Sequence, residues 1–408
     1  MLKWPTRITS AVIAIAALGL PISTLSAADP IADSVSKAIN EGDIALNFRY
    51  RYEYVDQDGL PKDANASTLR TRLTVTSGEV GGFQVLVQGD NVSYLGNDNF
   101  NNTDNGKTSY PVVADPDYTE VNQAFISYAF YEKNKVIGGR QSINYADQRF
   151  IGSVGWRQNE QTMDSARFQL NPMSGLTLDY SYIWRVNRIF DPDSDKSKFK
   201  GDSHAAIVSY KIAEGHTLSA YGYLLDLDEA PTLSSKTFGA TYQGSFKPSE
   251  RIGLGLSLAA AQQQEYNDNP NDYSADYYFG ELTAKFKLLS ISLGYEELGS
   301  DDGISLQTPL ATLHKFQGFA DKFLTTPVDG MEDTYIKAVT TVGGIKLIVF
   351  YHEFEAENGS MDYGSEFDFV AAYKFNKNYS VLFKYAAYDA DDFASDTDKA
   401  WLMLTAAF

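Results

Sequence analysis

Hydrophobic and polar residues alternate along most of this chain with the period of two that is typical of β-strands. Residues 44–54 show the pattern most clearly. One face of this segment carries large apolar and aromatic side chains: Ile44, Leu46, Phe48, Tyr50, Tyr52 and Tyr54. The other face is mostly polar: Ala45, Asn47, Arg49, Arg51 and Glu53. Because similar segments recur up to Phe408, the pattern predicts a closed barrel with lipid outside and a wet lumen inside.

The same alternation assigns faces to later segments, such as 176–187, 280–288, 366–375 and 400–408. In the first of these, the expected outward set is Leu176, Leu178, Tyr180, Tyr182, Trp184 and Val186. The expected inward set is Asp179, Ser181, Arg185 and Asn187. A basic side chain on the lipid face costs about 2–4 kcal/mol at the bilayer midplane. We therefore expect Arg185 and the other strand arginines to point into the lumen.

Two kinds of connection separate the expected strands, and they alternate strictly. Eight are tight turns, such as 213–216 and 342–344, and nine are longer polar loops, such as 95–118, 144–160 and 298–333. These connections predict an all-β transmembrane antiparallel β-barrel of about 18 strands, with about 16 as the alternative. Barrels of this kind have short periplasmic turns and long extracellular loops. We find no helix-length amphipathic stretch.

The longest expected loop, 298–333, is unusually apolar for a free loop tip. It contains Phe316, Phe319 and Phe323 together with His314 and Lys322. Long loops inside a compact domain are usually functional and need packing partners. We therefore expect this loop to pack into or across the mouth of the barrel.

The N-terminal residues have the order of a secretory signal peptide. Lys3 and Arg7 precede an apolar stretch, and small residues at 26–28 end the segment. The expected organisation is a signal peptide at 1–28 and one barrel domain at 29–408, placed in the outer membrane of a Gram-negative cell. The chain has no cysteine, so its closure depends on strand pairing and not on disulfides.

Charge is unevenly distributed along the chain. Without the expected signal peptide, the formal net charge is −21, which argues against a nucleic-acid partner. Eleven arginines follow residue 28, and ten of them lie between Arg49 and Arg188. Two pairs, Arg49 with Arg51 and Arg70 with Arg72, are spaced at i and i+2 on neighbouring strands. Each pair can therefore present both guanidinium groups to the lumen.

The candidate solute-contacting residues combine these arginines with amides and an indole ring from the segment 138–167. They are Arg49, Arg51, Arg70, Arg72, Arg140, Gln141, Arg149, Trp156, Arg157, Gln158, Arg167 and Arg185. Guanidinium groups bind carboxylates through two parallel hydrogen bonds, and a ring with nearby amides suits a polyhydroxylated anion.

Three interpretations of these residues stay open. In the first, they form a track that selects anionic or sugar-acid solutes. In the second, the arginines pair with acids such as Glu53, Asp164 and Asp179 and line a general porin for small hydrophilic solutes. In the third, the segment 138–167 is a structural loop that its own polar network ties to the barrel wall.

Little in the sequence supports catalysis, and we expect no enzyme activity, cofactor or bound metal. The four histidines, His204, His216, His314 and His352, lack metal-ligand spacing, and no serine lies in a G-x-S-x-G setting. Acidic stretches at 191–196, 267–272 and 389–398 do not match the EF-hand pattern, so we expect solvated loop tips there. No nucleotide-binding loop is present either, so transport would follow the solute gradient.

Three segments resemble a known family: LRTRL at 69–73, GRQSINYADQRFIGSVGWRQN at 139–159 and QTPLATLHKFQGFADKFLTTPVDGMED at 307–333. On these segments, the chain resembles the alginate-export porins of Gram-negative outer membranes from about residue 43 to the end. The resemblance implies an 18-stranded barrel whose lumen passes an acidic polysaccharide or its fragments. The lumen cations that it implies are Arg49, Arg72, Arg140, Arg149, Arg157 and Arg167.

The C-terminal segment 399–408, which ends on Phe408, resembles the terminal signature by which outer-membrane proteins are recognised for assembly. The expected partners are therefore the barrel-assembly machinery, acting through Phe408, and outer-membrane lipid and lipopolysaccharide. The third expected partner is an anionic saccharide or another small hydrophilic solute.

Overall fold

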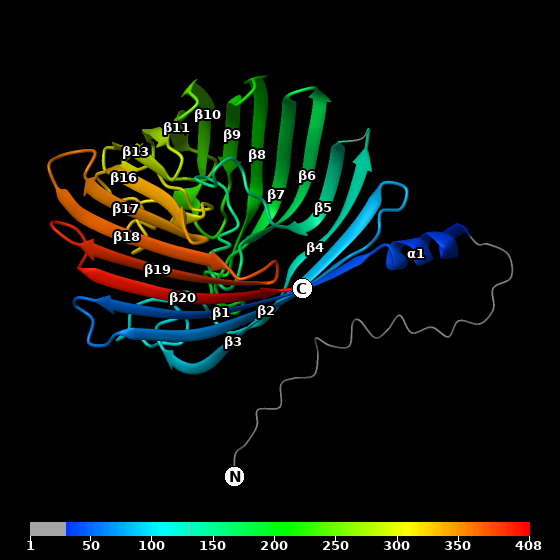
Figure 1. Cartoon of the computed structure of the whole chain (residues 1–408), viewed down its shortest axis with the longest axis horizontal. Coiled ribbons are helices and arrows are strands. Elements are labelled where there is room, and N and C mark those ends of the chain that lie inside the picture. Colours follow the sequence, from blue (N-terminus) through cyan, green and yellow to red (C-terminus); the bar gives the residue numbers. More distant parts are fainter. Residues whose placement is uncertain (1–29, 132) are drawn as a thin grey trace, which may run out of the picture.

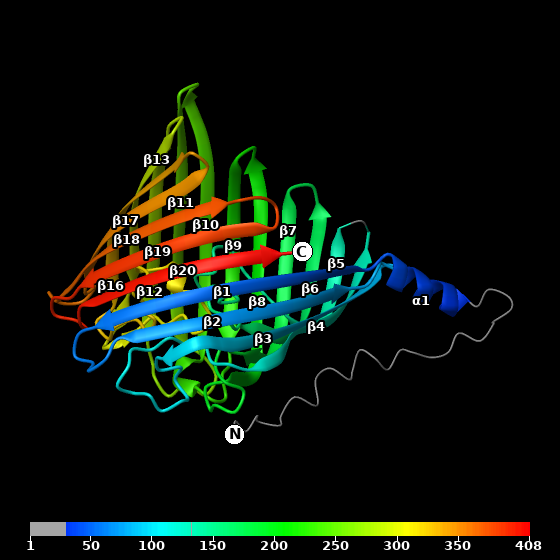
Figure 2. The same cartoon turned by 60° about the horizontal axis from the view of Figure 1, so that its bottom comes forward.

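The structure is a computed structural model that describes residues 30–131 and 133–408. The predicted signal peptide, 1–28, therefore lies outside the described residues. The described part begins with the helix α1 (Pro30–Asn40), which extends away from the strands (Figures 1 and 2). This helix corrects the expectation that the chain has no helix-length amphipathic stretch. Its apolar residues Ile31, Val35, Ala38 and Ile39 recur at helical spacing, but over only eleven residues.

Within the described residues, eighteen strands form one closed antiparallel sheet (Figure 1). The strands are β1 (Asp43–Gln57), β2 (Ala64–Thr76), β3 (Phe83–Asn99), β4 (Thr119–Phe130), β5 (Asn134–Gln141), β6 (Thr162–Met173), β7 (Leu176–Asn187), β8 (Lys198–Ala213), β9 (His216–Leu225), β10 (Ser235–Ser249), β11 (Ile252–Glu265), β12 (Ser274–Lys285), β13 (Leu289–Leu298), β16 (Met331–Val342), β17 (Ile345–Glu355), β18 (Asp362–Lys374), β19 (Tyr379–Asp389) and β20 (Thr397–Ala407). The predicted barrel and its 18 strands are confirmed.

The ring closes where β20 pairs with β1, and Figure 2 shows these two strands side by side. Leu46 and Phe408 exchange two backbone hydrogen bonds of 2.9 Å at this seam. Each strand otherwise pairs with its neighbours in the sequence, as expected for a meander. Closure leaves no unpaired sheet edge, which is the condition for a β-sheet to cross a bilayer.

The two ends of the barrel differ in their connections. At one end, here called the turn end, adjacent strands are joined by short turns, such as Gly343–Gly344 between β16 and β17. At the other, the loop end, the connections are long, and they include η2 (Pro231–Leu233), β14 (Ser300–Asp301), β15 (Ile304–Ser305) and η3 (Leu313–Lys315). The predicted alternation of tight turns and long loops is confirmed.

Most of the predicted faces are also confirmed. On β20, Leu402 and Leu404 are exposed on the outer wall, whereas Trp401, which precedes Leu402, is fully buried in the lumen. On β18, Phe367 is exposed and the adjacent Asp368 is buried. Alternation is therefore a sound guide to the wall wherever a strand is regular.

One strand departs from its predicted faces because it contains a β-bulge. Against β6, Ile183 pairs with Ser165 and Arg185 pairs with Asp164, so that Trp184 is an extra residue in β7. Ile183 and Val186, three residues apart, are consequently both buried on the inner side. Arg185 lies next to Val186 and therefore on the opposite, outer face. The predictions that Val186 faces lipid and that Arg185 and Asn187 face the lumen are wrong.

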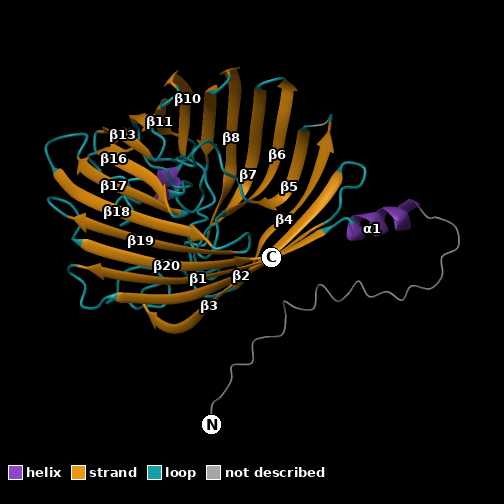
Figure 3. Cartoon of the chain, viewed as in Figure 1, coloured by secondary structure: helices purple, strands orange, loops and turns teal. Residues whose placement is uncertain are grey.

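The lumen is largely filled at the loop end. Loop residues 142–161 and 299–330, the latter with η3, enter the ring of strands. Figure 3 shows loops inside this ring. Ile151, Leu310 and Phe323 from these loops join one apolar cluster with wall residues such as Tyr277 and Trp401. The expectation that the longest loop packs into the barrel is confirmed. An apolar core thus lies inside a barrel whose outer wall is also apolar.

Candidate functional site

Four arginines project from β1 and β2 into the lumen at neighbouring levels. Arg49 lies directly opposite Arg70 in the register of the two strands, and Arg51 and Arg72 occupy the same face. Arg49, Arg51 and Arg70 are buried, and the side chain of Arg72 is only 16% exposed. Like charges at this spacing repel one another, so the arrangement requires compensating groups.

The 142–161 loop supplies part of this compensation. Arg49 donates from Nε to Gln158 Oε1 (2.9 Å), from Nη1 to the carbonyl oxygen of Gly155 (2.9 Å), and from Nη2 to the carbonyl oxygen of Arg157. Gln158 in turn donates from Nε2 to Thr68 Oγ1 on β2 (2.8 Å). The loop is therefore fastened to both arginine-bearing strands, which agrees with the interpretation of a loop held by its own polar network.

A third inserted loop, 100–118, supplies a carboxylate partner for Arg51. Arg51 Nη1 lies 3.3 Å from Asp115 Oδ2, and its guanidinium stacks over the ring of Trp156 at 4.4 Å. Asp115 also accepts a hydrogen bond from the backbone N–H of Gln158 (2.8 Å). Asp115, Arg51 and Gln158 are all fully buried. The three loops and the wall thus share one charge network.

Arg157 stands at the centre of this network. Its guanidinium contacts Glu53 on β1 (3.1 Å) and Asp321 of the 299–330 loop (3.1 Å), and Lys399 on β20 also contacts Asp321 (2.9 Å). Burial by itself lowers the pKa of Arg157, but Glu53, Asp115 and Asp321 raise it above its ordinary value. Likewise, burial would raise the pKa of Asp321, yet its cationic neighbours hold that pKa well below the ordinary value. These groups are therefore charged at neutral pH.

A second fastening joins the two largest inserted loops. The segments at Ile151 and Leu310 form a parallel β-bridge, and Gly152 N–H donates to the carbonyl oxygen of Leu310 (2.8 Å). Arg149 completes the junction, because its Nε lies 2.7 Å from Glu296 of β13 and its Nη1 donates to Thr308 Oγ1 (3.2 Å). The 142–161 and 299–330 loops therefore form one constriction.

An aromatic and basic stack forms one side of the constriction. Trp156 and His314 are stacked with their ring centroids 4.5 Å apart, and Lys384 Nζ lies 2.8 Å from His314 Nε2. His314 Nδ1 lies 2.6 Å from Asp321 Oδ1. Burial lowers the pKa of His314 well below its ordinary value. The neutral ring fits both contacts, since Nδ1–H donates to Asp321 and Nε2 accepts from the ammonium group.

The remaining predicted site residues lie apart from this constriction. Arg167 binds Asp179 on β7 through two hydrogen bonds (2.8 and 2.6 Å), and Gln141 is buried at the end of β5. Arg140 pairs with Asp164 (2.8 Å), which lies opposite Arg185 in the register. The prediction that Arg140 points into the lumen is wrong, because Asp164 is adjacent to the fully buried Met163 and shares the outer face with Arg185.

Arg140 and Arg185 can lie on the outer wall because both occur near the loop end. The cost of a basic side chain falls from about 2–4 kcal/mol at the bilayer midplane to about 0–1 kcal/mol near the interface. The midplane cost, on which the prediction for Arg140 and Arg185 rests, does not hold near the loop end.

A cavity of about 570 Å³ lies at the loop end, above the constriction. Its charged lining is mostly basic: Arg157, Arg188, Lys196, Lys322, Lys399 and Asp321. Burial and the neighbouring Lys399 lower the pKa of Lys322 to about 8, and burial lowers that of Arg188 to about 10. In the described part of the chain, Arg188, Lys196 and Lys322 have no carboxylate within ion-pair distance. We call this cavity the basic vestibule.

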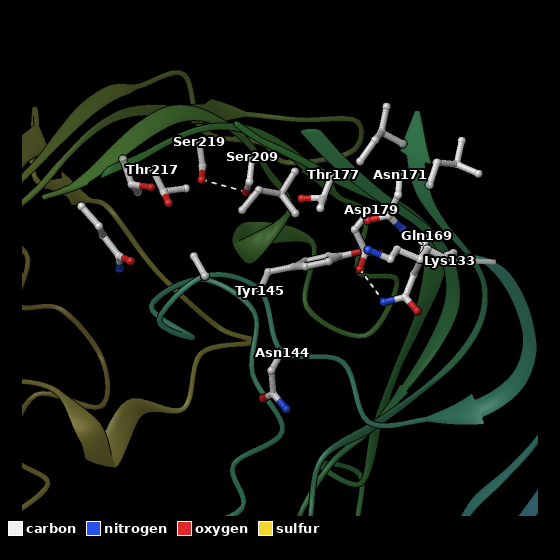
Figure 4. A pocket seen from close by; sticks show the side chains of 16 residues that line it. Lys133, Asn144, Tyr145, Gln169, Asn171, Thr177, Asp179, Ser209, Thr217 and Ser219 are labelled. Carbon is white, nitrogen blue, oxygen red and sulfur yellow. Dashed lines mark hydrogen bonds between the residues drawn. The ribbon is translucent and has the colours of Figure 1, made fainter. Parts of the chain in front are cut away.

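A second cavity, of about 500 Å³, lies toward the turn end and has a different lining. Its wall is mostly hydroxyl and amide, including Thr177, Ser209, Thr217, Ser219 and Gln243, as Figure 4 shows for most of these residues. Ser209 and Ser219 are hydrogen-bonded to each other (2.8 Å). Apart from Lys133 and Asp179, this cavity offers neutral donors and acceptors, whereas the basic vestibule offers charge.

Several important residues were not identified from the sequence. Asp115 and Asp321 are single acids inside long loops, and nothing local distinguishes them from solvated loop residues. Lys384 and Lys399 do occupy inward positions of β19 and β20, so alternation alone could have identified them. No cluster of three or more metal-binding side chains occurs in the residues that the structure describes, and none of the helices there is long and apolar enough to span a membrane.

Comparison with solved structures identifies the class of the fold. The crystal structure of OccK9 (OpdG) of Pseudomonas aeruginosa matches with a TM-score of 0.73 at 16% sequence identity, over 91% of this chain and 99% of that one. OccAB4 of Acinetobacter baumannii matches with a TM-score of 0.72 at 14% identity, over 90% and 98%. The structure of P. aeruginosa OpdK with vanillate gives 0.72 at 16%, over 91% and 99%. The fold is that of outer-membrane porins.

Comparison at the level of sequence identifies the family. The family model described as Alginate export matches residues 41–271, more than half of the chain. The protein therefore belongs to the alginate export family, and it is a porin-type β-barrel of the Gram-negative outer membrane. A comparison with curated proteins gives no match. Membership of this family confirms the resemblance seen in the sequence.

Proposed function

We propose that this barrel is a passive channel for small anionic solutes, with sugar acids or fragments of an acidic polysaccharide as the preferred class. The observation that carries the proposal is the charge of the basic vestibule, where five basic side chains face one carboxylate. Three of these cations, Arg188, Lys196 and Lys322, have no carboxylate partner among the described residues and can therefore attract an anion.

The predicted site residues take two roles in this proposal. Arg49, Arg51, Arg149 and Gln158 hold the inserted loops through hydrogen bonds and ion pairs, and Trp156 does so by stacking against the Arg51 guanidinium. Arg157 lines the basic vestibule, and Arg70 lies below it with Asn47 as its partner (3.0 Å). We propose that Arg70, which has no carboxylate within ion-pair distance among the described residues, contacts the solute on its way through the lumen.

Two further observations support a small hydroxylated carboxylate over a long polymer. The inserted loops pack against each other across the lumen, which favours fragments over a continuous chain. The hydroxyl- and amide-lined cavity near the turn end suits the hydroxyl groups of such a solute. Among the similar folds, OpdK was crystallised with vanillate, itself a small carboxylate.

The alternative is a general porin for small hydrophilic solutes. The pairing of many lumen arginines with acids, such as Arg72 with Asp90 (2.6 Å), favours it, because a paired arginine has little affinity left for an anion. Both functions are transport, and neither assigns the chain a catalytic role.

The experiment that tests the proposal is the reversal potential of single channels in a potassium chloride gradient. We expect wild-type channels to prefer chloride and to be blocked by glucuronate oligomers more strongly than by neutral oligosaccharides of the same length. Replacing Arg188, Lys196 and Lys322 with Gln should lower the anion preference at least about fivefold, because loss of even one charge contact in water costs roughly 1 kcal/mol.

The matched control, called here the turn-end control, replaces Lys211, Lys247 and Arg251 with Gln. These residues are exposed at the opposite end of the barrel and carry the same total charge. It should leave the anion preference nearly unchanged. Equal permeability to potassium and chloride in the wild type, with equal block by neutral and acidic oligosaccharides, would favour the general porin instead.

We also propose that Phe408 presents its side chain to the barrel-assembly machinery. Its ring is 58% exposed on the outer wall and packs edge-on against Tyr379 at 5.8 Å. Its backbone is engaged in the seam with Leu46, so the side chain is the part that is free for recognition.

A further inference from the structure

A row of basic residues crosses the outer wall at the loop end of β5–β8. The sheet register places Arg140 opposite Asp164, Asp164 opposite Arg185, and Arg185 opposite Lys200. Lys198 lies in the adjacent row of the same face, opposite Asn187. We call Arg140, Arg185, Lys198 and Lys200 the outer basic row. Figure 1 shows the four strands as neighbours.

The position of this row on the outer face follows from its neighbours in the chain. Three of these neighbours belong to the apolar cluster inside the lumen. They are Met163, next to Asp164; Val186, next to Arg185; and Phe199, between Lys198 and Lys200. Adjacent residues of a strand point to opposite faces. The row therefore lies outside the lumen, where a solute in transit does not meet it.

The charges of the row are only partly compensated. Asp164 accepts a hydrogen bond from Arg140 Nε (2.8 Å), but its nearest approach to Arg185 is 3.7 Å. Lys198 and Lys200 are exposed and have no carboxylate within ion-pair distance among the described residues. Two further acids lie beside the row: Asp202 accepts a hydrogen bond from Tyr182 on the outer face, and Glu229 Oε2 accepts one from the backbone N–H of Lys200 (2.6 Å). The four basic groups therefore outnumber Asp164, Asp202 and Glu229 by one.

The depth of the row is set by the aromatic residues beside it. Trp184, the bulge residue of β7, is 40% exposed, and Tyr182 precedes it on the outer face of the same strand. Exposed Trp and Tyr side chains mark the level at which hydrocarbon gives way to headgroups. The row begins at the next residue toward the loop end, so it lies at the level of the headgroups of the outer leaflet.

A small cavity adjoins the row and can admit a headgroup substituent. Its volume is about 250 Å³, and Arg140, Lys198, Asn187, Arg188 and Ser197 contribute to its lining. The lining contains three basic side chains, Arg140, Arg188 and Lys198, and one carboxylate, Glu120. It therefore carries a net positive charge at neutral pH. Arginine and lysine side chains arranged in this way are typical of phosphate binding.

We propose that the outer basic row and this cavity bind a phosphate group of lipopolysaccharide in the outer leaflet. The occupant must be anionic, present in the membrane and phosphorylated at headgroup depth, and the phosphorylated glycolipid of this leaflet has all three properties. The row lies outside the lumen and its proposal does not depend on the transport function, although the cavity shares Arg188 with the basic vestibule. The variant that tests the row therefore leaves Arg188 unchanged.

The test measures binding of fluorescent lipid A to the purified full-length barrel in a neutral detergent. We expect wild-type protein to bind bisphosphorylated lipid A and to bind dephosphorylated lipid A much more weakly. Replacing Arg185, Lys198 and Lys200 with Gln should weaken binding of the phosphorylated form on the order of 100-fold, because each basic group near an anionic surface contributes roughly 1 kcal/mol.

The turn-end control removes the same charge at the other end of the barrel and should bind as the wild type does. Single-channel conductance of both variants reports whether the barrel is intact. Equal binding by wild type and the row variant, or an equal loss in the control, would overturn the proposal. Displacement of lipid A by inorganic phosphate alone would also overturn it, since the site would then be one for free phosphate.

Discussion

The arginines of β1–β2 and those of β5–β7 have similar sequence contexts but different surroundings. Arg49 and Arg51 point inward and are buried among loop carbonyl groups, Gln158 and Asp115. Arg140 and Arg185 point outward at the loop end and share the single acid Asp164. The first group holds the constriction in place, whereas the second lies where the wall meets lipid headgroups.

The difference shows that the depth and face of an arginine, not its spacing, decide its role. One extra residue in β7, at Trp184, is enough to reverse the face of Arg185. On β1 the register has no such shift against either neighbour, and Arg49 and Arg51 stay on the inner face.

The largest effect that separates the two groups is expected for Arg157→Ala. The change leaves Glu53 and Asp321 as buried carboxylates with one cation fewer, and loss of one partner from a buried ion pair costs about 3–5 kcal/mol. Stability of the refolded protein against urea, followed by tryptophan fluorescence, should fall by this amount. Arg140→Ala on the outer wall should cost no more than about 1 kcal/mol, and similar losses for both variants would contradict the comparison.

A moderate effect is expected at the junction of the two inserted loops. A Cβ added at Gly152 would overlap Thr312 Oγ1 and lie 3.1 Å from Thr312 N, so Gly152→Val should push the loops apart. Overpacking of this kind costs about 1–3 kcal/mol, and single-channel conductance should rise. In Gly155→Ala the nearest atom to the new Cβ is 3.6 Å away, so this variant should conduct as the wild type does. Unchanged conductance in Gly152→Val would show that the loops do not limit the current.

The smallest effect is the dependence of selectivity on pH. Burial, followed by repulsion from Lys399, lowers the pKa of Lys322 to about 8. The ammonium group is charged below this value and neutral above it, so anion preference should be present near pH 7 and decline toward about pH 9. Reversal potentials at the two pH values measure this change. Lys322→Gln should remove the decline, and a decline that persists in this variant would assign it to another group.

The sequence was sufficient for the fold because a membrane wall imposes strict rules. Lipid requires an apolar outer face, a closed ring and a fixed strand length. Each requirement produces a regular local pattern in the amino-acid sequence. The faces of Trp401, Leu402 and Asp368 were therefore predictable, and so were the 18 strands.

The candidate site was less predictable because its contacts are not local. Arg157 and Asp321 are 164 residues apart, and neither residue carries a local sign of its partner. The alternation of side chains along a regular strand does not reveal the bulge at Trp184. The sequence could indicate that basic residues matter here, but only the folded loops show which of them are already paired.

The apolar cluster inside the lumen gives the molecule two kinds of cohesion. The outer wall contacts lipid, so its strands are held to one another mainly by backbone hydrogen bonds. The interior loops, with Ile151, Leu310 and Phe323 among them, are held partly by the expulsion of water, as in a soluble domain. Because the hydrophobic effect weakens on cooling, low temperature loosens the inserted loops before it affects the strands of the barrel.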